Sequence, residues 1–319
     1  MRLGIFGGAK DPQSLAMRAA FERLGHSTLL VEHDALDRGL PVSFDEGRTF
    51  YRGECVDDVH GYYLRFVPAP YAPVLSRNDR FELYEDWFVH YMQTRERASF
   101  FVSWLLQLQH RGVTLVNAPH AGSVLQYKPF QLHVLRSVGA RVPQTLISND
   151  PQRVREFHAA VGEVIFKPVM GGAETKLLDA AALKGLDKIS AAPVIFQERV
   201  RGDDLRVMLV GDEVVSCVAI ETPAQHLDFR ADPAYGGGRA AYREVVLPEG
   251  VKDQCRKAAR QCGLHLAGID IKAHGDNYVF LELNSSPVYL DVELKLGHPI
   301  TEKIARLVAS GAERAATQA

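Results

Sequence analysis

The 319-residue sequence lacks several features that mark common classes of binding protein. Its four cysteines form no CxxC pair and its twelve histidines form no HxH or HExxH motif, which disfavours zinc chemistry. No stretch reaches the roughly 18 uninterrupted apolar residues of a membrane span. The formal charge is −2, from 37 basic and 39 acidic residues, without the basic excess of a nucleic-acid binder. We therefore expect neither a membrane nor a nucleic acid as partner.

Other absences concern the compartment and the nucleotide motif. The opening residues MRLGIFGGAKDP contain no long apolar segment, so we expect no signal peptide. Cys255 and Cys262 are seven residues apart in a helical pattern, which favours small buried side chains over a disulfide. We expect a protein of the reducing cytoplasm. The pair Gly7-Gly8 does not complete GxGxxG and indicates a tight turn at a strand end.

Hydrophobic residues make up 46% of the chain, which is long enough for two domains or three small lobes. The first third alternates short apolar runs with helical patterns, and this alternation predicts an α/β fold with a mostly parallel sheet. The predicted strands are Leu3–Phe6, Leu29–Val31, Tyr62–Val67 and Val113–Val116, and the predicted helices are residues 12–24 and Phe81–Arg111.

The rest of the chain shows more strands and fewer long helices. We predict helices over Lys128–Ser137 and from Pro151, the second with Asp150 as its cap, because aspartate before a proline is a common helix start. The predicted strands include Val164–Lys167, Val194–Val200, the hairpin Leu205–Val210 with Val214–Ile220, and the pair Ala267–Ala273 and Tyr278–Leu283.

The last of these strand pairs carries the strongest chemical signal. Alternation along the strands places Ile269, Ile271 and Ala273, with Val279, Leu281 and Leu283, toward the core. The opposite face then holds Asp270, Glu282 and Asn284. A three-residue turn, 275–277, would set Asp270 directly across from Glu282. Two close carboxylates repel unless a cation lies between them, and oxygen ligands suit Mg²⁺. The alternative is a solvated polar face of an edge hairpin.

Cationic side chains occur around this pair in the sequence. Lys128 begins a helix, Lys167 ends a buried-looking strand, and Arg206 lies two residues after Asp204. Arg230 lies in a loop rich in glycine. Each has a plainer explanation, because a lysine at a strand end can keep its head in water and an arginine beside an aspartate can be a surface ion pair.

The order of these motifs resembles the ATP-grasp ligases, and most of all the branch of the ribosomal protein S6 glutamate ligase RimK. The resemblance covers about residues 128–309, and seven motifs occur in the same order. They are Lys128, Lys167-Pro168, Gln197-Glu198, Asp204-Leu205-Arg206, Asp228-Phe229-Arg230, Gly268-Ile269-Asp270, and the E-x-N-x-S-P signature within Leu281–Pro287.

This resemblance implies an α/β (α+β) ATP-grasp fold with ATP bound between two lobes. It implies a domain order of 1–117 as an α/β leader, 118–193 as the central lobe, 194–310 as the C-terminal lobe and 311–319 as a flexible tail. It also implies ATP and Mg²⁺, or Mn²⁺, as cofactors.

The resemblance further assigns a role to each matching residue. Lys128 and Lys167 would contact ATP phosphates, and Arg206 and Arg230 would act in catalysis. The stretch Gln197, Glu198, Arg199 and Val200 would form the adenine hinge, and Asp204 would bind the ribose. Asp232 would face the phosphates, although relatives often carry asparagine there. The metal ligands would be Asp270, Glu282 and Asn284. The loop 169–176 is short, which weakens the phosphate contacts expected of Gly171 and Gly172.

The function implied is an ATP-dependent carboxylate–amine ligase that works through an acyl phosphate on a peptide, a protein or an amino acid. A looser likeness, in residues 116–150, is to ATP-grasp maturases of ribosomal peptides, which join side-chain carboxylates to amines or hydroxyls. A nucleotide-binding module without catalysis is the third alternative. The sequence leaves open whether the chain is a monomer, a homodimer or a tetramer.

Overall fold

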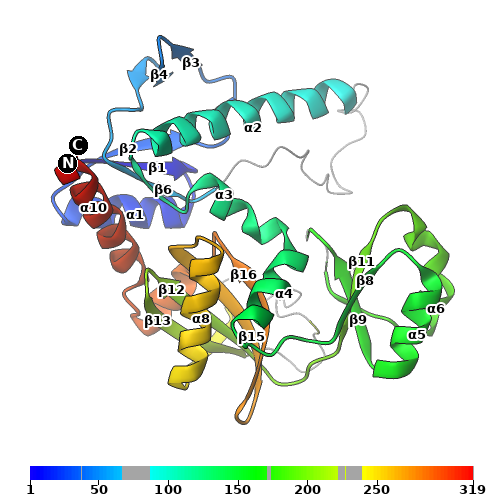
Figure 1. The fold of residues 1–319 in the computed structure, drawn as a ribbon. Helices are drawn as coiled ribbons and strands as arrows, with labels where there is room; N and C mark the ends of the chain where they lie inside the picture. The colour runs from blue at the N-terminus through cyan, green and yellow to red at the C-terminus, as the bar shows by residue number, and fades with distance from the viewer. Residues whose placement is uncertain (37, 67–86, 171–173, 222–226, 228–238, 319) are drawn as a thin grey trace. The chain divides into compact units, whose positions relative to one another are not determined.

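The computed structural model describes residues 1–36, 38–66, 87–170, 174–221, 227 and 239–318 (Figure 1). The chain forms two compact units. The first comprises Met1–Ser123 together with Pro299–Ala319, and the second comprises Val124–His298.

The first unit has a four-stranded parallel sheet in the order β2-β1-β6-β7 and a small antiparallel sheet in the order β3-β4-β5. Its strands are β1 (Arg2–Gly7), β2 (Ser27–Glu32), β3 (Val42–Asp45), β4 (Arg48–Tyr51), β5 (Glu54–Cys55), β6 (Gly61–Leu64) and β7 (Thr114–Val116). Its helices are α1 (Pro12–Arg23), α2 (Trp87–His110), α3 (Pro119–Gly122) and α10 (Ile300–Gln318), and a 3₁₀ turn, Ser123–Gln126, follows α3. The predicted parallel α/β opening is confirmed.

Helix α1 begins where the sequence supplies a cap. The Asp11 carboxylate accepts a hydrogen bond from the Ser14 amide at 2.8 Å, and Pro12 occupies the first turn. The helix returns the chain so that β2 lies parallel to β1. In Figure 1, α1 and α2 lie on opposite sides of this sheet, the two-layer cover that a parallel sheet needs.

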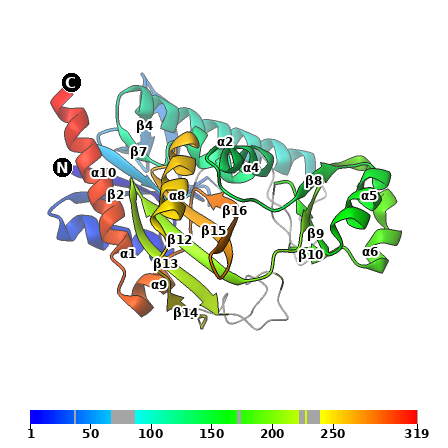
Figure 2. The same ribbon diagram turned by 60° about the horizontal axis from the view of Figure 1, so that its bottom comes forward.

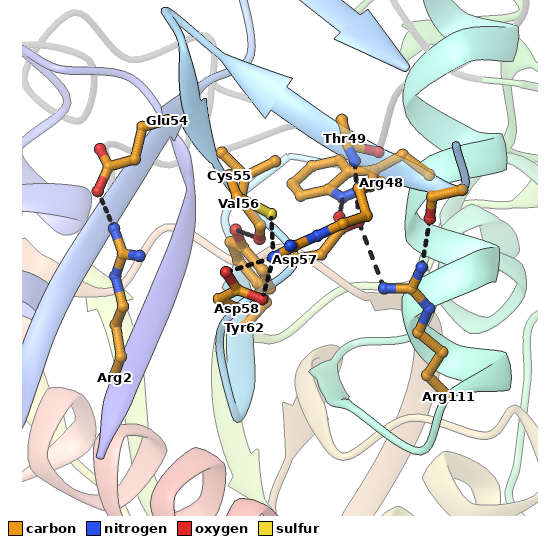
Figure 3. Close-up of polar contacts among 12 residues, drawn as sticks. Arg2, Arg48, Thr49, Glu54, Cys55, Val56, Asp57, Asp58, Tyr62 and Arg111 are labelled. Atoms are coloured by element: carbon orange, nitrogen blue, oxygen red, sulfur yellow. Dashed lines mark hydrogen bonds and ion pairs between the residues drawn. The ribbon is translucent and has the colours of Figure 1, made fainter. Parts of the chain in front are cut away.

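A buried carboxylate joins the small sheet to α2. The Asp57 side chain is 1% exposed. It accepts hydrogen bonds from the Trp104 indole nitrogen at 2.8 Å and from the Thr49 amide at 2.8 Å, and it pairs with Arg111 at 3.3 Å. Figure 3 shows Asp57 between Thr49 and Arg111. Because these donors come from β4 and from α2, one carboxylate fixes the hairpin on the helix. This contact was not predicted from the sequence.

Helix α10 differs from the tail predicted for residues 311–319. The helix continues to Gln318, and its residues Ile304, Val308 and Ala312 are buried. A Cβ built on Gly61 of β6 would lie 3.0 Å from a methyl of Val308. The helix therefore packs on the first unit, whereas the sequence assigned residues up to 310 to the C-terminal lobe.

The second unit begins with α4 (Lys128–Ser137), with the bounds predicted. A four-stranded sheet follows in the order β10-β9-β11-β8. Its strands are β8 (Thr145–Ser148), β9 (Val164–Pro168), β10 (Lys176–Leu177) and β11 (Val194–Glu198), and its helical segments are α5 (Pro151–Val161), α6 (Ala180–Lys184) and the 3₁₀ helix Leu186–Ala191. Asp150 caps α5 as predicted, accepting from the Gln152 amide at 2.8 Å. Because β11 pairs with both β8 and β9, this lobe ends after Glu198 rather than at residue 193.

A five-stranded antiparallel sheet completes the second unit, in the order β14-β13-β12-β15-β16 (Figure 2). Its strands are β12 (Asp203–Val210), β13 (Glu213–Glu221), β14 (Ala241–Glu244), β15 (Leu266–His274) and β16 (Asn277–Asn284), with helices α8 (Glu249–Gln261) and α9 (Leu290–Leu296). Cys255 and Cys262 are buried as predicted. Among the described residues, no helix is long and apolar enough to cross a membrane.

Replacing Asp57 by alanine would leave a buried indole N–H and a buried amide without an acceptor. We expect the free energy of unfolding to fall by about 2–4 kcal/mol. Urea titration followed by circular dichroism measures this, with Asp58→Ala as control because the Asp58 side chain is 61% exposed. Equal stability of the two variants would contradict the role given to Asp57.

Burial raises the pKa of Cys217 and of Cys255 to about 12, and that of Cys262 to about 11. These thiols stay protonated at pH 8, and only the thiolate reacts. We expect a disulfide reagent to label native protein at Cys55, which is partly exposed, and to reach the other three cysteines only in denaturant. Rapid labelling of all four in the native protein would contradict this burial.

Candidate functional site

The two carboxylates singled out in the sequence lie side by side on one face of the five-stranded sheet. The strand register sets Arg206 of β12 opposite Asp270 of β15, and Asp270 opposite Glu282 of β16. Directly opposed residues project to the same face of a sheet. Arg206, Asp270 and Glu282 therefore form a line across three strands, which we call the charged row.

The hairpin reaches this register by a route that the sequence did not predict. Its loop has two residues, 275–276, instead of the three-residue turn 275–277. Continued without interruption, this pairing would set Asp270 opposite Leu281. A β-bulge beside Asp270 inserts one residue and brings Glu282 into place. The opposition of Asp270 and Glu282 is confirmed, and the bulge is its cause.

The bulge also changes which residues of β16 face the core. We predicted Val279, Leu281 and Leu283 as one core-facing set. In the structure Val279 lies on the same face as Asp270, and Leu281 is half-buried at the bulge. Phe280, fully buried, takes the core-facing place. One inserted residue reverses every side chain on one side of it.

Cations neutralise both carboxylates of the charged row. A guanidinium nitrogen of Arg206 lies 2.9 Å from Asp270. The Lys128 ammonium contacts Glu282, and the Lys167 ammonium lies 4.0 Å from the same carboxylate. All five side chains are at most 14% exposed. Buried charges need such pairing, because desolvation of an unpaired ion costs several kcal/mol.

The oxygen donors of this face suit a hard divalent cation. Asp270 and Glu282 each supply a carboxylate, and Asn284 follows two residues later on the same face of β16. The Asn284 amide nitrogen donates to Asp270 at 3.2 Å, which places this side chain beside that carboxylate. Two carboxylates with an amide oxygen are a set that Mg²⁺ accepts together with phosphate oxygens and water. The donor set therefore fits the metal implied by the sequence.

A buried glutamine fixes the strand that carries two of these ligands. β16 is an edge strand, and Gln131 of α4 lies along its outer side. The Gln131 amide accepts from the Leu283 backbone N–H at 3.0 Å and donates to the Leu283 carbonyl at 3.0 Å. Its side chain thus replaces a neighbouring strand at the residue between Glu282 and Asn284.

The loop after β16 approaches β15 at a glycine. A Cβ on Gly268 would lie 2.6 Å from the Cβ of Pro287 and 3.1 Å from a guanidinium nitrogen of Arg206. A larger residue would displace either the loop or the arginine. This close contact explains why the motif that contains Asp270 begins with glycine.

A second charged pair lies next to the row. Asp204 is opposite Lys272, and their side chains are 2.7 Å apart. Both lie on the same face as Arg206 and Asp270, because they are two residues away along each strand. The sequence analysis missed Lys272, although its spacing from Asp270 was a usable signal. The Lys272 ammonium places a positive charge next to Asp204, the residue predicted to bind the ribose.

The predicted hinge residues contact the lobe that contains strands β8 to β11. The buried Gln197 donates to Thr145 at 3.0 Å. The backbone N–H of Glu198 donates to the Gln144 carbonyl, and that of Arg199 to the Glu163 carbonyl.

The remaining hinge side chains lie partly exposed. The Arg199 side chain pairs with Glu163 at 3.3 Å, and Val200 is half-buried. The backbone N–H groups of residues 198 and 199 already donate hydrogen bonds within this lobe. Arg230 and Asp232, like Gly171 and Gly172, lie outside the residues that the structure describes.

Comparison with known proteins gives a consistent assignment. The model of the RimK-like ATP-grasp domain matches residues 126–308. The ribosomal protein bS6–L-glutamate ligase of Escherichia coli O81 is 30% identical over 189 residues, which are 56% of this chain and 61% of that enzyme. The charged row and both lysines lie inside residues 126–308.

Solved structures match over nearly the whole chain. The ATP-grasp ligase PsnB, solved with a phosphomimetic variant of its minimal precursor, Mg and ADP, is 32% identical with a TM-score of 0.83, over 97% of this chain and 98% of that one. A Chryseobacterium gregarium RiPP-associated ATP-grasp ligase is 18% identical with a TM-score of 0.78, over 97% and 96%. At 18% identity, the second match supports a similarity of fold alone.

Replacing Gln131 by methionine keeps the side-chain volume and removes both hydrogen bonds to Leu283. We expect the free energy of unfolding to fall by about 1–3 kcal/mol, because a buried N–H and a buried C=O lose their partner. Hydrogen exchange at the Leu283 amide should accelerate in the same variant.

The control is Gln152→Met on the surface of α5, which we expect to change stability by less than about 0.5 kcal/mol. Unchanged exchange at Leu283 in Gln131→Met would show that β16 keeps its place without this glutamine.

Proposed function

Because the chain belongs to the RimK-like ATP-grasp ligases, we propose that it joins a carboxylate to an amine, or to a hydroxyl, at the expense of ATP. One observation carries the proposal: two buried carboxylates lie side by side, each paired with a cation, on the sheet face where Asn284 adds a third oxygen donor. A structural surface hairpin has no need of such a concentration of buried charge.

The charged row supports a division of roles. Asp270, Glu282 and Asn284 would hold Mg²⁺, which when bound neutralises phosphate charge and orients the phosphates. The ammonium groups of Lys128 and Lys167 lie next to the Glu282 carboxylate in this structure. An anion bound beside Glu282 would therefore be within their reach. They would contact the phosphates of ATP. Arg206 would support the developing charge of the reacting group, because a guanidinium stays ionised and donates in a fixed fork.

The reaction needs little chemistry from the protein itself. An oxygen of the substrate carboxylate attacks the γ-phosphorus of ATP, ADP leaves, and an acyl phosphate forms. The amine or hydroxyl then attacks the acyl carbon, inorganic phosphate leaves, and the nucleophile loses a proton. Phosphoryl transfer depends chiefly on positioning and on neutralised charge. The described side chains supply both through the row and its two lysines.

The nucleotide base and sugar would bind next to this row. Asp204 would receive the ribose hydroxyls, with Lys272 holding its carboxylate in place at 2.7 Å. The stretch 197–200 would provide the adenine contacts through groups other than the amides of residues 198 and 199, which already donate within the lobe. The roles of Arg230 in catalysis and of Asp232 beside the phosphates are proposed from the sequence motif alone.

We favour a peptide as the substrate that carries the carboxylate. The likeness to PsnB, a ligase solved with a precursor peptide, extends over both units of this chain. The likeness to the bS6–L-glutamate ligase covers 56% of it. The first unit is therefore shared with a peptide-binding relative, which supports the maturase alternative for the linkage formed.

Replacing Glu282 by glutamine tests the assignment. We expect ADP formation with MgATP and substrate peptide to fall about 100-fold or more, because one metal-binding carboxylate loses its charge. Asp270→Asn should act in the same way. The control is Glu156→Gln on the surface of α5, with circular dichroism to show that each variant is folded. Wild-type activity in Glu282→Gln would contradict the metal assignment.

The wild-type protein separates the remaining alternative. Binding of MgATP without any ADP formation over a panel of precursor peptides, proteins and amino acids would identify a nucleotide-binding module instead of a ligase.

A further inference from the structure

A cavity of about 400 Å³ lies in the first unit, far in sequence from the charged row. It is lined by three arginines, by one glutamate, and by a set of apolar and hydroxyl-bearing side chains. The lining residues are Arg2, Arg18, Arg52, Glu54, Ile5, Leu29, Leu30, Thr28 and Tyr51. This volume is within the range of pockets that hold ligands.

The cavity follows the outer edge of strand β2. This strand ends the sheet order β2-β1-β6-β7 and pairs with β1 on its other side. Leu30 is opposite Ile5, and Leu29 projects to the other face, where it belongs to the same apolar cluster as Tyr51. Because residues from both faces line the cavity, its opening lies at the strand edge itself.

The arginines reach this edge from both sides. Arg18 comes from α1, and Arg52 comes from the tip of the β4–β5 turn, while α1 and the small sheet lie on opposite sides of the parallel sheet (Figure 1). Arg2 pairs with Glu54 beside them (Figure 3). Three arginines against one glutamate give the lining a formal charge of +2.

The guanidinium groups retain capacity for carboxylates. Arg18 contacts Glu22 through its Nε at 3.0 Å, and Arg2 contacts Glu54 through one terminal nitrogen. A guanidinium has five N–H donors. Both arginines therefore already bind carboxylates of the chain itself and have further donors to offer.

Arg52 occupies a backbone position where arginine is uncommon. Its φ is +54°, and Gly53 follows at +82°. Positive φ at both central residues is the pattern of a two-residue hairpin turn in which asparagine is preferred first. The structure thus presents an exposed arginine at a point where a polar residue with better turn propensity would serve the fold.

We propose that this cavity binds an extended peptide with carboxylates on successive residues, which adds as a strand to the edge of β2. Successive side chains of such a strand project to opposite faces. One set would meet Arg18, and the other would meet Arg2 and Arg52. The backbone edge gives affinity and the arginines select acidic residues, as in other cases of strand addition. The apolar side chains of Leu29 and Leu30, one on each face of the sheet, distinguish this ligand from a lone phosphate.

The proposal goes beyond ligation, because the cavity belongs to the first unit and the charged row to the second. It holds whether or not the charged row catalyses the proposed reaction. Binding is therefore measured without ATP, on the full chain, so that its failure is separate from a failure of the ligase assay.

The probe is the fluorescein-labelled peptide Glu-Glu-Val-Glu-Glu-Val, titrated at low salt and followed by fluorescence anisotropy. Arg52→Asn should weaken binding about tenfold, because one cation is lost from the lining, while thermal stability stays equal or rises. Arg18→Met should weaken binding comparably. The matched control is Glu46→Asn in the other turn of the small sheet, where Glu46 has φ +45°, and it should leave the peptide affinity at least as high.

Hydrogen exchange locates the bound peptide. The amides of Thr28 and Leu30 should be protected on binding, because Ser27 and His33 donate toward β1 and the even-numbered amides between them therefore point outward. The peptide Gln-Gln-Val-Gln-Gln-Val should not bind. Equal affinity for Arg52→Asn and wild type, or protection confined to other strands, would overturn the proposal. Displacement of the peptide by millimolar inorganic phosphate would overturn it in favour of a plain anion site.

Discussion

The chemistry of the second unit depends on keeping two carboxylates next to each other in a buried place. Asp270 and Glu282 are at most 6% exposed and stand directly opposite across two strands. Like charges so arranged are stable only when cations share the site. Arg206, Lys128 and Lys167 meet that need in the free chain. The proposed metal and nucleotide would bind in the same field, with the lysines passing from Glu282 to phosphate.

Backbone devices, more than side-chain choice, set this geometry. A two-residue loop and one β-bulge together bring Glu282 opposite Asp270. Gln131 then holds β16 from outside at Leu283, where an edge strand would otherwise end the sheet. The first unit contains a similar contact, in which the carboxylate of Asp57 joins the small sheet to α2. In both units one buried polar side chain fixes an element that lacks a full hydrogen-bonding neighbour.

Sequence reasoning succeeded where local rules decide the outcome. The bounds of α4, the cap at Asp150 and the parallel opening all follow from turn residues, caps and periodicity. It failed where contacts between distant segments decide. Strand β11 belongs to the first lobe of the second unit because of its two neighbours, and α10 returns to the first unit because its apolar side meets β6. Neither partner can be read from the segment itself.

The sequence by itself determined the chemical inventory, namely the acids, lysines and arginine in the order that marks the family. It also determined that Glu282 and Asn284 share one face of their strand, since alternation is a local property of extended chains. The tertiary structure alone decided which carboxylate meets which cation, that Lys272 joins Asp204, and that three arginines gather at the edge of β2. Those pairings join segments up to 154 positions apart, and such distances close only when the whole chain packs.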